Sequence, residues 1–204
     1  MDAQPNLILL AGPNGAGKST ASSRLLIGAL EVHEFVNADV IAQGLSAFNP
    51  EAASLEAGRV MLRRLRHLTD LRVNVAFEST LASRSFAPWI RRLRDTGYNF
   101  HLFYYWLPTP EMAIQRVAHR KRLGGHTVPE ETIRRRYDAG LRNFFSLYSP
   151  IADHWTFYDN SEPANPILIA RGGSREECSV KDPVQWNILQ VRASNNVRRE
   201  DTDD

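Results

Sequence analysis

Short apolar runs alternate with longer amphipathic segments along most of the chain. The first run, residues 6–11, ends at a glycine-rich turn, as expected of a strand that is buried on both faces of a parallel sheet. Similar runs predict strands near residues 34–37, 73–77, 99–107 and 155–159. Because helix-patterned sequence separates each run from the next, the pattern predicts an α/β fold. It has a parallel sheet with right-handed crossovers and helices on its faces.

Local sequence signals mark where three of the predicted helices begin, and two of them include a capping side chain. Residues 49–51 (Asn-Pro-Glu) and 109–111 (Thr-Pro-Glu) each offer a capping side chain, a proline at the first helical position and a carboxylate in the first turn. A third helix opens at residues 128–131 and carries an apolar stripe on one face. Between the last two helices, residues 123–127 (Leu-Gly-Gly-His-Thr) form a flexible segment where a small helical lid would sit.

Composition fits one globular domain. The 204 residues are 43% hydrophobic, which is enough for a single core. We assign residues 1–192 to it and expect the polar residues 193–204 to form a disordered tail. Cys178 is the only cysteine, so an intramolecular disulfide is impossible.

Charge and hydropathy narrow the range of partners. The net charge of +2 gives no general case for binding nucleic acid. No segment approaches the roughly 18 consecutive apolar residues that a membrane span requires, and the amino terminus has no basic region ahead of an apolar stretch. We therefore expect a cytoplasmic protein without a membrane or nucleic-acid partner.

The glycine-rich turn carries the strongest chemical signal. Residues 12–19 fit the pattern G-x-x-x-x-G-K-[ST] directly after a buried strand and before a helix. In such a P-loop, backbone N–H groups and the helix amino end face the phosphates, Lys18 reaches the β- and γ-phosphates, and the Ser19 hydroxyl ligates Mg²⁺. The predicted nucleotide-binding residues are Gly12, Pro13, Asn14, Gly15, Ala16, Gly17, Lys18, Ser19 and Thr20.

Two carboxylates follow predicted strands. Asp39 comes just past the second strand and Glu78 just past the third. If both strands flank the P-loop strand, both carboxylates face the γ-phosphate. Asp39 is then the candidate base that takes a proton from an acceptor hydroxyl, unless it only caps the helix that begins beside it. Glu78 would hold the acceptor or a Mg²⁺-bound water, unless it pairs with a buried arginine. Thr80 is either an acceptor contact or an ordinary turn residue.

Arginines surround the predicted lid. Arg116 and Arg120 lie four residues apart on one helical face, and Arg134, Arg135 and Arg136 follow on the next helix. Phosphoryl transfer needs cations over the transferring group, a task that suits the planar guanidinium. The alternative for each arginine is a solvated helix edge paired with nearby carboxylates.

These segments together resemble the zeta toxin family of P-loop kinases, from about Leu7 to about Ala170. The resemblance is carried by residues 11–20, by 37–39 (Asn-Ala-Asp), by 77–82 (Phe-Glu-Ser-Thr-Leu-Ala), and by Arg116 to Pro129 with its two glycines. The P-loop alone is shared with many families, and the Asp39 and Glu78 segments in order with it are more specific.

The resemblance implies a kinase that uses ATP and Mg²⁺ to phosphorylate the 3′-hydroxyl of the amino sugar of UDP-N-acetylglucosamine. It implies that Asp39 is the base, that Glu78 and Thr80 hold the sugar nucleotide, and that Arg116 and Arg120 are the nearest matches to the arginines that contact the γ-phosphate. The sequence departs from the longer toxins at residues 125–127 (Gly-His-Thr), where those carry an arginine. A small antitoxin protein is a further implied partner.

Two other functions stay open at this point. One is a P-loop kinase for another sugar, nucleotide or small hydroxyl acceptor. The other is a regulatory nucleotide-binding switch, which normally has an aspartate at the end of an apolar strand, a position that Glu78 only approximates. In all three cases the predicted fold is the three-layer α/β fold of P-loop NTPases and nucleotide kinases.

Overall fold

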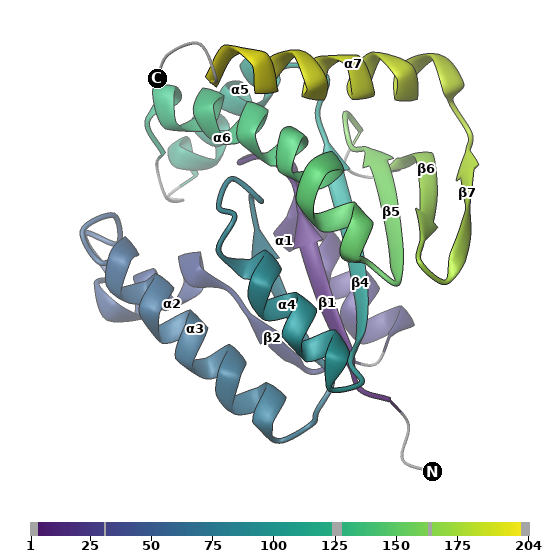
Figure 1. Ribbon diagram of the computed structural model, residues 1–204. Coiled ribbons are helices and arrows are strands. Elements are labelled where there is room, and N and C mark those ends of the chain that lie inside the picture. The colour runs from purple at the N-terminus through teal and green to yellow at the C-terminus, as the bar shows by residue number, and fades with distance from the viewer. Residues whose placement is uncertain (1–3, 31, 124–127, 163–164, 201–204) are drawn as a thin grey trace.

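A mixed β-sheet forms the centre of the protein (Figure 1). The computed structural model describes residues 4–30, 32–123, 128–162 and 165–200. In these residues seven strands pair in the order β2-β3-β1-β4-β5-β6-β7. The strands are β1 (Asn6–Ala11), β2 (Glu34–Val36), β3 (Val75–Ser79), β4 (Asn99–Trp106), β5 (His154–Asp159), β6 (Ile167–Gly173) and β7 (Glu176–Val180).

The first five strands are parallel, as the sequence predicts. β1 lies between β3 and β4, and its residues Leu7 to Ala11 are almost completely buried. This burial on both faces explains why its sequence is continuously apolar. β2 pairs with β3 and does not touch β1, so the condition that both carboxylate-bearing strands flank β1 is met by β3 alone.

Two antiparallel strands extend the sheet at the other edge. β6 pairs antiparallel with β5, and β7 with β6. The sequence pattern missed both strands, because β6 ends in two glycines and β7 has no buried residue. The predicted all-parallel sheet is therefore corrected to a mixed one.

Helices cover the sheet. In Figure 1, α4 and α6 lie in front of the strands and α1 lies behind them, which gives the predicted three-layer α/β fold. The helices are α1 (Lys18–Ser22), α2 (Ala38–Leu45), α3 (Ser54–Asp70), α4 (Phe86–Asp95), α5 (Pro110–Arg122), α6 (Glu130–Asn143) and α7 (Pro183–Glu200), with π-helical turns at Ser23–Ala29 and Phe144–Tyr148 and a 3₁₀ turn at Ser149–Ile151. None of the described helices is both long and apolar enough to cross a membrane.

Two of the three predicted helix starts agree with the structure, and one of them has a side-chain cap. Thr109 accepts a hydrogen bond from the Met112 N–H at 3.2 Å and caps α5, and α6 begins after Pro129. The third start is displaced. Asn49 accepts from the Ala52 N–H at 3.3 Å, but this bond closes a turn, and α3 begins only at Ser54.

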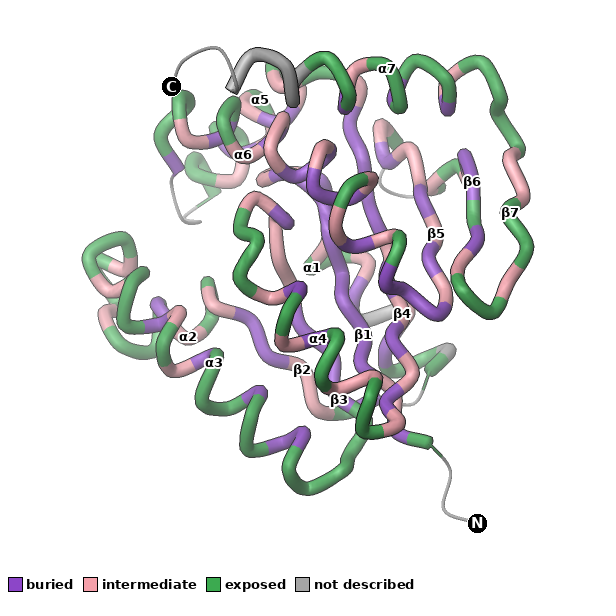
Figure 2. Tube along the Cα trace, in the orientation of Figure 1, coloured by how far each residue is buried: buried purple, intermediate pink, exposed green. Residues whose placement is uncertain are grey.

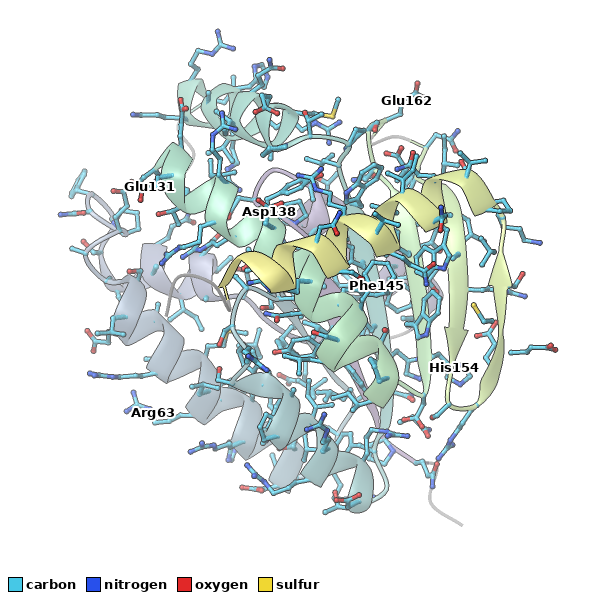
Figure 3. All side chains as sticks on the ribbon, turned by 45° about the horizontal axis from the view of Figure 1, so that its top comes forward. Arg63, Glu131, Asp138, Phe145, His154 and Glu162 are labelled. Carbon is cyan, nitrogen blue, oxygen red and sulfur yellow. The ribbon has the colours of Figure 1, made fainter. Side chains whose placement is uncertain are left out.

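An aromatic cluster joins α7 to the sheet. Trp186 of α7 stacks on Trp155 with ring centroids 5.4 Å apart, and it contacts Phe145 at 5.0 Å, which Figure 3 marks beside α7. Figure 2 shows that the central strands are mostly buried and that the outer turns of the helices are exposed. Ala193, where the sequence predicts a tail to begin, is buried, and α7 runs on to Glu200. The predicted tail is therefore helical up to that residue, and residues 201–204 lie outside the described ones.

A buried aspartate stabilises the amino edge of the sheet, which is the side where the parallel strands begin. Asp153 is 1% exposed and accepts two hydrogen bonds from Arg94, at 2.7 and 3.0 Å, and one from the Phe100 N–H at 2.8 Å. Ser174 and Arg175 complete its surroundings. Burial alone would raise the pKa of Asp153, but these donors outweigh it and lower the pKa to about 2.

Candidate active site

The P-loop needs glycine at three positions. Gly12, Gly15 and Gly17 have φ values of +137°, +77° and +80°, where L side chains are strained. A Cβ atom at Gly12 would also overlap the carbonyl of Tyr105 at the end of β4. The loop therefore lies tightly against the sheet, and α1 begins at Lys18 directly after it.

Lys18 folds back over this loop. Its Nζ donates to the carbonyls of Gly12 and Pro13 at 2.9 and 3.0 Å. Burial of the ammonium lowers the pKa of Lys18, while the negative charges of Glu78 and Asp39 act in the opposite direction. Lys18 is therefore close enough to both carboxylates for their charges to affect its pKa.

Glu78 joins the P-loop helix to the end of β2. The Ser19 hydroxyl donates to its two oxygens at 3.0 and 3.1 Å, and the Asn37 amide donates to Oε2 at 2.5 Å. The hydrogen bonds of Glu78 therefore come from Ser19 and Asn37. The alternative from the sequence was a buried arginine partner. Burial raises the pKa of Glu78, and Lys18 and the Ser19 hydrogen bond oppose this rise. Glu78 lies inside β3, one residue before its end, and not just past it as predicted.

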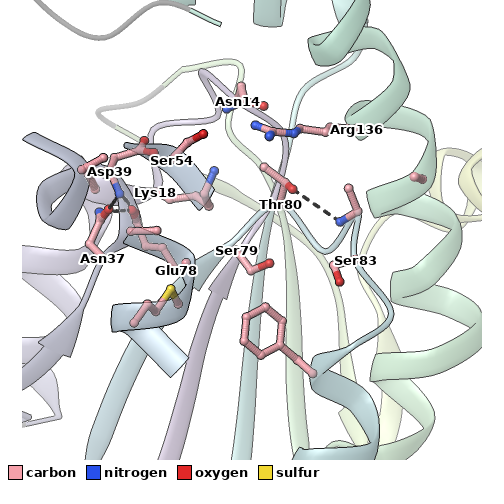
Figure 4. Close-up of a pocket in the computed structure, with 18 of the residues that line it drawn as sticks. Asn14, Lys18, Asn37, Asp39, Ser54, Glu78, Ser79, Thr80, Ser83 and Arg136 are labelled. Carbon is pink, nitrogen blue, oxygen red and sulfur yellow. Dashed lines mark hydrogen bonds between the residues drawn. The ribbon is translucent and has the colours of Figure 1, made fainter. Parts of the chain in front are cut away.

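Asp39 does not cap α2. Asn37 is the cap, since its Oδ1 accepts from the N–H groups of Asp39 and Val40 at 2.8 and 3.4 Å. Asp39 lies in the first helical turn, and Figure 4 shows it on the same side of the pocket as Lys18 and Glu78. Sequence reasoning missed Asn37, although an asparagine between a strand and a helix is a capping signal.

All of these side chains line one cleft of about 1130 Å³. The cleft includes every predicted catalytic and acceptor-binding residue, that is, Lys18, Asp39, Glu78, Thr80, Arg116 and Arg120, together with Asn14, Gly15, Gly17, Ser19 and Thr20 of the P-loop segment. Gly12, Pro13 and Ala16 form the frame of the loop and do not line the cleft. The structure thus brings together residues that are more than 100 positions apart in the sequence.

Cations dominate the cleft lining. Besides Lys18, the lining arginines are Arg59, Arg84, Arg116, Arg120, Arg135, Arg136 and Arg142, against the two carboxylates Asp39 and Glu78. Arg136 reaches in from α6 (Figure 4), and burial lowers its pKa against the opposing effect of Asp39. Arg134 instead pairs with Glu111 at 2.5 Å on the exposed edge of α5 and α6, as the solvated alternative predicted. The predicted lid residues 124–127, with His126, lie outside the described residues.

The Arg116 guanidinium forms hydrogen bonds with the loop after β5. Its two terminal nitrogens donate to the carbonyls of Asn160 and Ser161, at 2.9 and 2.5 Å. Burial lowers the pKa of this guanidinium, and Asp159 opposes the effect. The predicted contact with a γ-phosphate therefore competes with two hydrogen bonds that the protein already makes.

A strained turn forms the wall after β3. Leu81 is fully buried and has a φ of +57°, which is unfavourable for a leucine. The Asn143 amide donates to the carbonyl of Leu81 at 2.7 Å and to that of Ala82 at 3.3 Å. A Cβ at Gly140 would overlap the Thr80 carbonyl. Contacts with helix α6 therefore hold this turn in its conformation. No local sequence pattern predicts these contacts.

A glycine-rich phosphate loop joins a parallel strand to a helix, and carboxylates and arginines line the cleft beside it. This combination defines the class of P-loop kinases. The model of the Zeta toxin family matches residues 1–165. The chain belongs to this family, which confirms the resemblance noted from its motifs.

Individual proteins resemble this chain in sequence or in fold. An uncharacterized protein of Haemophilus influenzae is 28% identical over 134 residues, which are 66% of this chain and 94% of that protein. A chain in the crystal structure of the AvrRxo1-ORF1:-ORF2 complex with ATP has a TM-score of 0.70 and 18% identity, with 92% of this chain and 64% of that chain covered. A chain from the PezAT toxin–antitoxin system of Streptococcus pneumoniae has a TM-score of 0.63 and 17% identity, with coverages of 95% and 85%. This protein thus spans less than two thirds of the AvrRxo1 chain and most of the other two.

Proposed function

We propose that this protein is an ATP-dependent kinase that phosphorylates the 3′-hydroxyl of the amino sugar of UDP-N-acetylglucosamine. The observation that carries the proposal is the position of Asp39. Its carboxylate does not cap α2, although it lies in the first turn of that helix. It lies in the same cleft as the P-loop and a group of arginines. A base, a phosphate cradle and cations are the parts that phosphoryl transfer to a hydroxyl requires.

The P-loop side of the cleft holds the donor. Backbone N–H groups of residues 12–19 bind the phosphates, and Lys18 exchanges its two loop carbonyls for phosphate oxygens. The Ser19 hydroxyl and the Glu78 carboxylate, 3.0 Å apart, are hard oxygen donors that suit Mg²⁺, directly or through water. The metal, when bound, neutralises charge on the β- and γ-phosphates.

Asp39 acts on the acceptor. Its carboxylate orients the sugar hydroxyl and takes its proton as the new oxygen–phosphorus bond forms and the bond to the β-phosphate oxygen breaks. Arg120 of α5 and Arg136 of α6 stabilise the negative charge on the transferring group. The transfer needs no covalent enzyme intermediate.

The rest of the cleft supports an acceptor that is itself an anion. Arg59, Arg84, Arg135 and Arg142 come from α3, the loop after β3, and α6, and add positive charge to the cleft lining. Leu55 and Leu62 of α3 add an exposed apolar surface to the same lining. A sugar nucleotide has a diphosphate for the arginines and flat or apolar faces for the leucines, and Thr80 and Glu78 would hold its sugar.

Partner and location belong to the same proposal. The Streptococcus pneumoniae structure is named as part of a chromosomal toxin–antitoxin system, which supports a small antitoxin protein as a partner here. We also place the protein in the cytoplasm, where ATP and sugar nucleotides are available.

The test is to measure ATP consumption by the purified protein with and without UDP-N-acetylglucosamine. We expect turnover that depends on the sugar nucleotide. Turnover stimulated only by another hydroxyl compound would replace the acceptor and retain the kinase. Turnover that no acceptor changes would contradict the kinase and favour a nucleotide switch.

A further inference from the structure

The loop after β5 reaches the P-loop through a buried amide. Asn160 is 1% exposed. Its N–H donates to the carbonyl of Trp106 at the end of β4, at 2.9 Å, and its side-chain Nδ2 donates to the carbonyl of Ala16 at 2.5 Å. One residue therefore ties the end of the sheet to the centre of the P-loop.

Arg116 holds the same loop from the other side. Its fork of two nitrogens spans the carbonyls of Asn160 and Ser161. The far side of this loop is fixed as well, since Asp159 accepts from the Ser161 N–H at 2.8 Å and from its hydroxyl at 2.5 Å. The two guanidinium hydrogen bonds thus set the position of Asn160 relative to α5.

The P-loop glycines show how closely these parts fit. A Cβ at Gly17 would come within 2.8 Å of the Asn160 Nδ2, and a Cβ at Gly15 would come within 2.8 Å of the Ala113 carbonyl and 3.1 Å of the Arg116 Cβ. Real Cβ atoms do not approach other atoms so closely without a shift. The middle of the P-loop is therefore packed directly against Asn160 and against the α5 turn that carries Arg116.

We propose that Arg116 and Asn160 are positioning residues that act together to hold the P-loop in the shape that binds a nucleotide. Arg116 fixes the loop after β5, and Asn160 transmits that position to the Ala16 carbonyl and the backbone N–H groups beside it. This assignment replaces the predicted contact of Arg116 with the γ-phosphate and leaves that contact to Arg120. It rests on the nucleotide binding proposed above and not on the identity of the acceptor.

The two roles of Arg116 differ in how they affect ADP and ATP. The P-loop backbone surrounds phosphates that both nucleotides have, so a distorted loop weakens both equally. A side chain that contacts the γ-phosphate affects ATP alone. Calorimetric Kd values for Mg²⁺-ADP and Mg²⁺-ATP therefore separate positioning from direct contact.

For Asn160→Leu and Arg116→Met we expect both Kd values to rise on the order of tenfold, with their ratio unchanged, because each leaves buried carbonyls without donors. The double variant should lose less than the product of the single effects, since both act on one loop. Arg122→Lys, an exposed change on the same helix, is the matched control and should leave both Kd values unchanged. Circular dichroism confirms that each variant is folded, and Arg116→Met still decides the matter if Asn160→Leu does not fold.

Arg116→Met that weakens ATP while the Kd for ADP is unchanged would overturn the proposal and restore the phosphate contact. Unchanged Kd values in both single variants would overturn it too. If the wild-type protein binds neither nucleotide, the proposed function fails together with this inference. Wild-type binding with normal values in the variants refutes the inference alone.

Discussion

Two carboxylates at opposite ends of the strands have pKa values that are shifted in opposite directions. One lies at the amino edge of the sheet, and the other lies at its carboxyl edge, where the parallel strands end. Asp153, before β5, is surrounded by donors that lower its pKa to about 2. Glu78, near the end of β3, has the Ser19 hydroxyl, the Asn37 amide and the charges of Lys18 and Arg120 around it, but burial outweighs them and its pKa is raised. The donors around Asp153 outweigh the effect of burial, whereas the groups around Glu78 do not. The amino edge therefore holds a carboxylate that stabilises the fold, and the carboxyl edge holds one whose charged form is disfavoured by burial.

Asp39→Ala should produce the largest change, at the carboxyl edge. Without the base, kcat should fall on the order of 1000-fold, since general base catalysis contributes effects of this size. Nucleotide affinity and thermal stability should stay close to wild type, because Asp39 caps nothing. Steady-state kinetics beside nucleotide titrations measure both. Glu56→Ala, an exposed carboxylate on α3, is the control, and substantial activity in Asp39→Ala would refute its assignment as the base.

Asp153→Asn should show the converse behaviour at the amino edge. Removing one partner from a buried, hydrogen-bonded charge pair costs about 3 kcal/mol of unfolding free energy. The kcat of the folded protein should not change, because the residue lies at the far edge of the sheet from the cleft. Urea unfolding gives the stability, with the exposed Asp70→Asn as control. A lower kcat without a stability loss would reverse the comparison.

Glu78→Gln separates function from stability at the other carboxylate. We expect kcat to fall about 100-fold, because the site loses a charge that holds metal or acceptor. The free energy of unfolding should remain within about 1 kcal/mol of wild type, because the variant removes a charge that burial disfavours. Kinetics and urea unfolding on one preparation test both statements. A stability loss as large as that of Asp153→Asn would make Glu78 a structural residue.

Acid should weaken the amino edge. Because the folded pKa of Asp153 is about 2 and its ordinary value is 3.8, its contribution is complete above pH 3.8 and is lost as the pH falls towards 2. The loss amounts to about 2 kcal/mol. Glu78 has the opposite sign, since protonation relieves the cost of burying its charge. Unfolding free energies measured from pH 5 to pH 2 should lose part of their acid dependence in Asp153→Asn, and an unchanged slope would contradict the assignment.

The smallest predicted effect concerns the strained turn after β3. Asn143→Leu removes the amide that holds Leu81 in its left-handed conformation. We expect the KM for the acceptor to rise about tenfold, as for the loss of one buried hydrogen bond, while nucleotide affinity is retained. Ser146→Ala, an exposed change one turn further on, serves as control. An unchanged KM would mean that the turn does not shape the acceptor site.

Local chemistry explains what the sequence predicted correctly. The P-loop, the Thr109 cap and the buried strand β1 each depend on residues within one short segment, so their patterns are legible in order. The strand order is not local, and the sequence had no means to place β3 between β2 and β1. β7 lacks the apolar pattern of a buried strand because it lies at the edge of the sheet, and in β6 the apolar residues are followed by an arginine and two glycines.

The same distinction applies to the site. Lys18, Asp39 and Glu78 were found because each stands beside a strand or motif with a known relation to phosphate. Asn143 was missed because its partner Leu81 is 62 residues away. The carbonyl partners of Arg116 are 44 and 45 residues away, and only the folded chain shows that its guanidinium points towards them.

Phosphate-31 NMR of one reaction containing the protein, Mg²⁺-ATP and UDP-N-acetylglucosamine tests the central claim most directly. The account predicts that the γ-phosphate signal of ATP disappears while a new phosphomonoester signal, attached to the sugar nucleotide, grows by the same amount. Inorganic phosphate as the only new product would contradict it, because the carboxyl edge would then serve hydrolysis and not transfer to a hydroxyl.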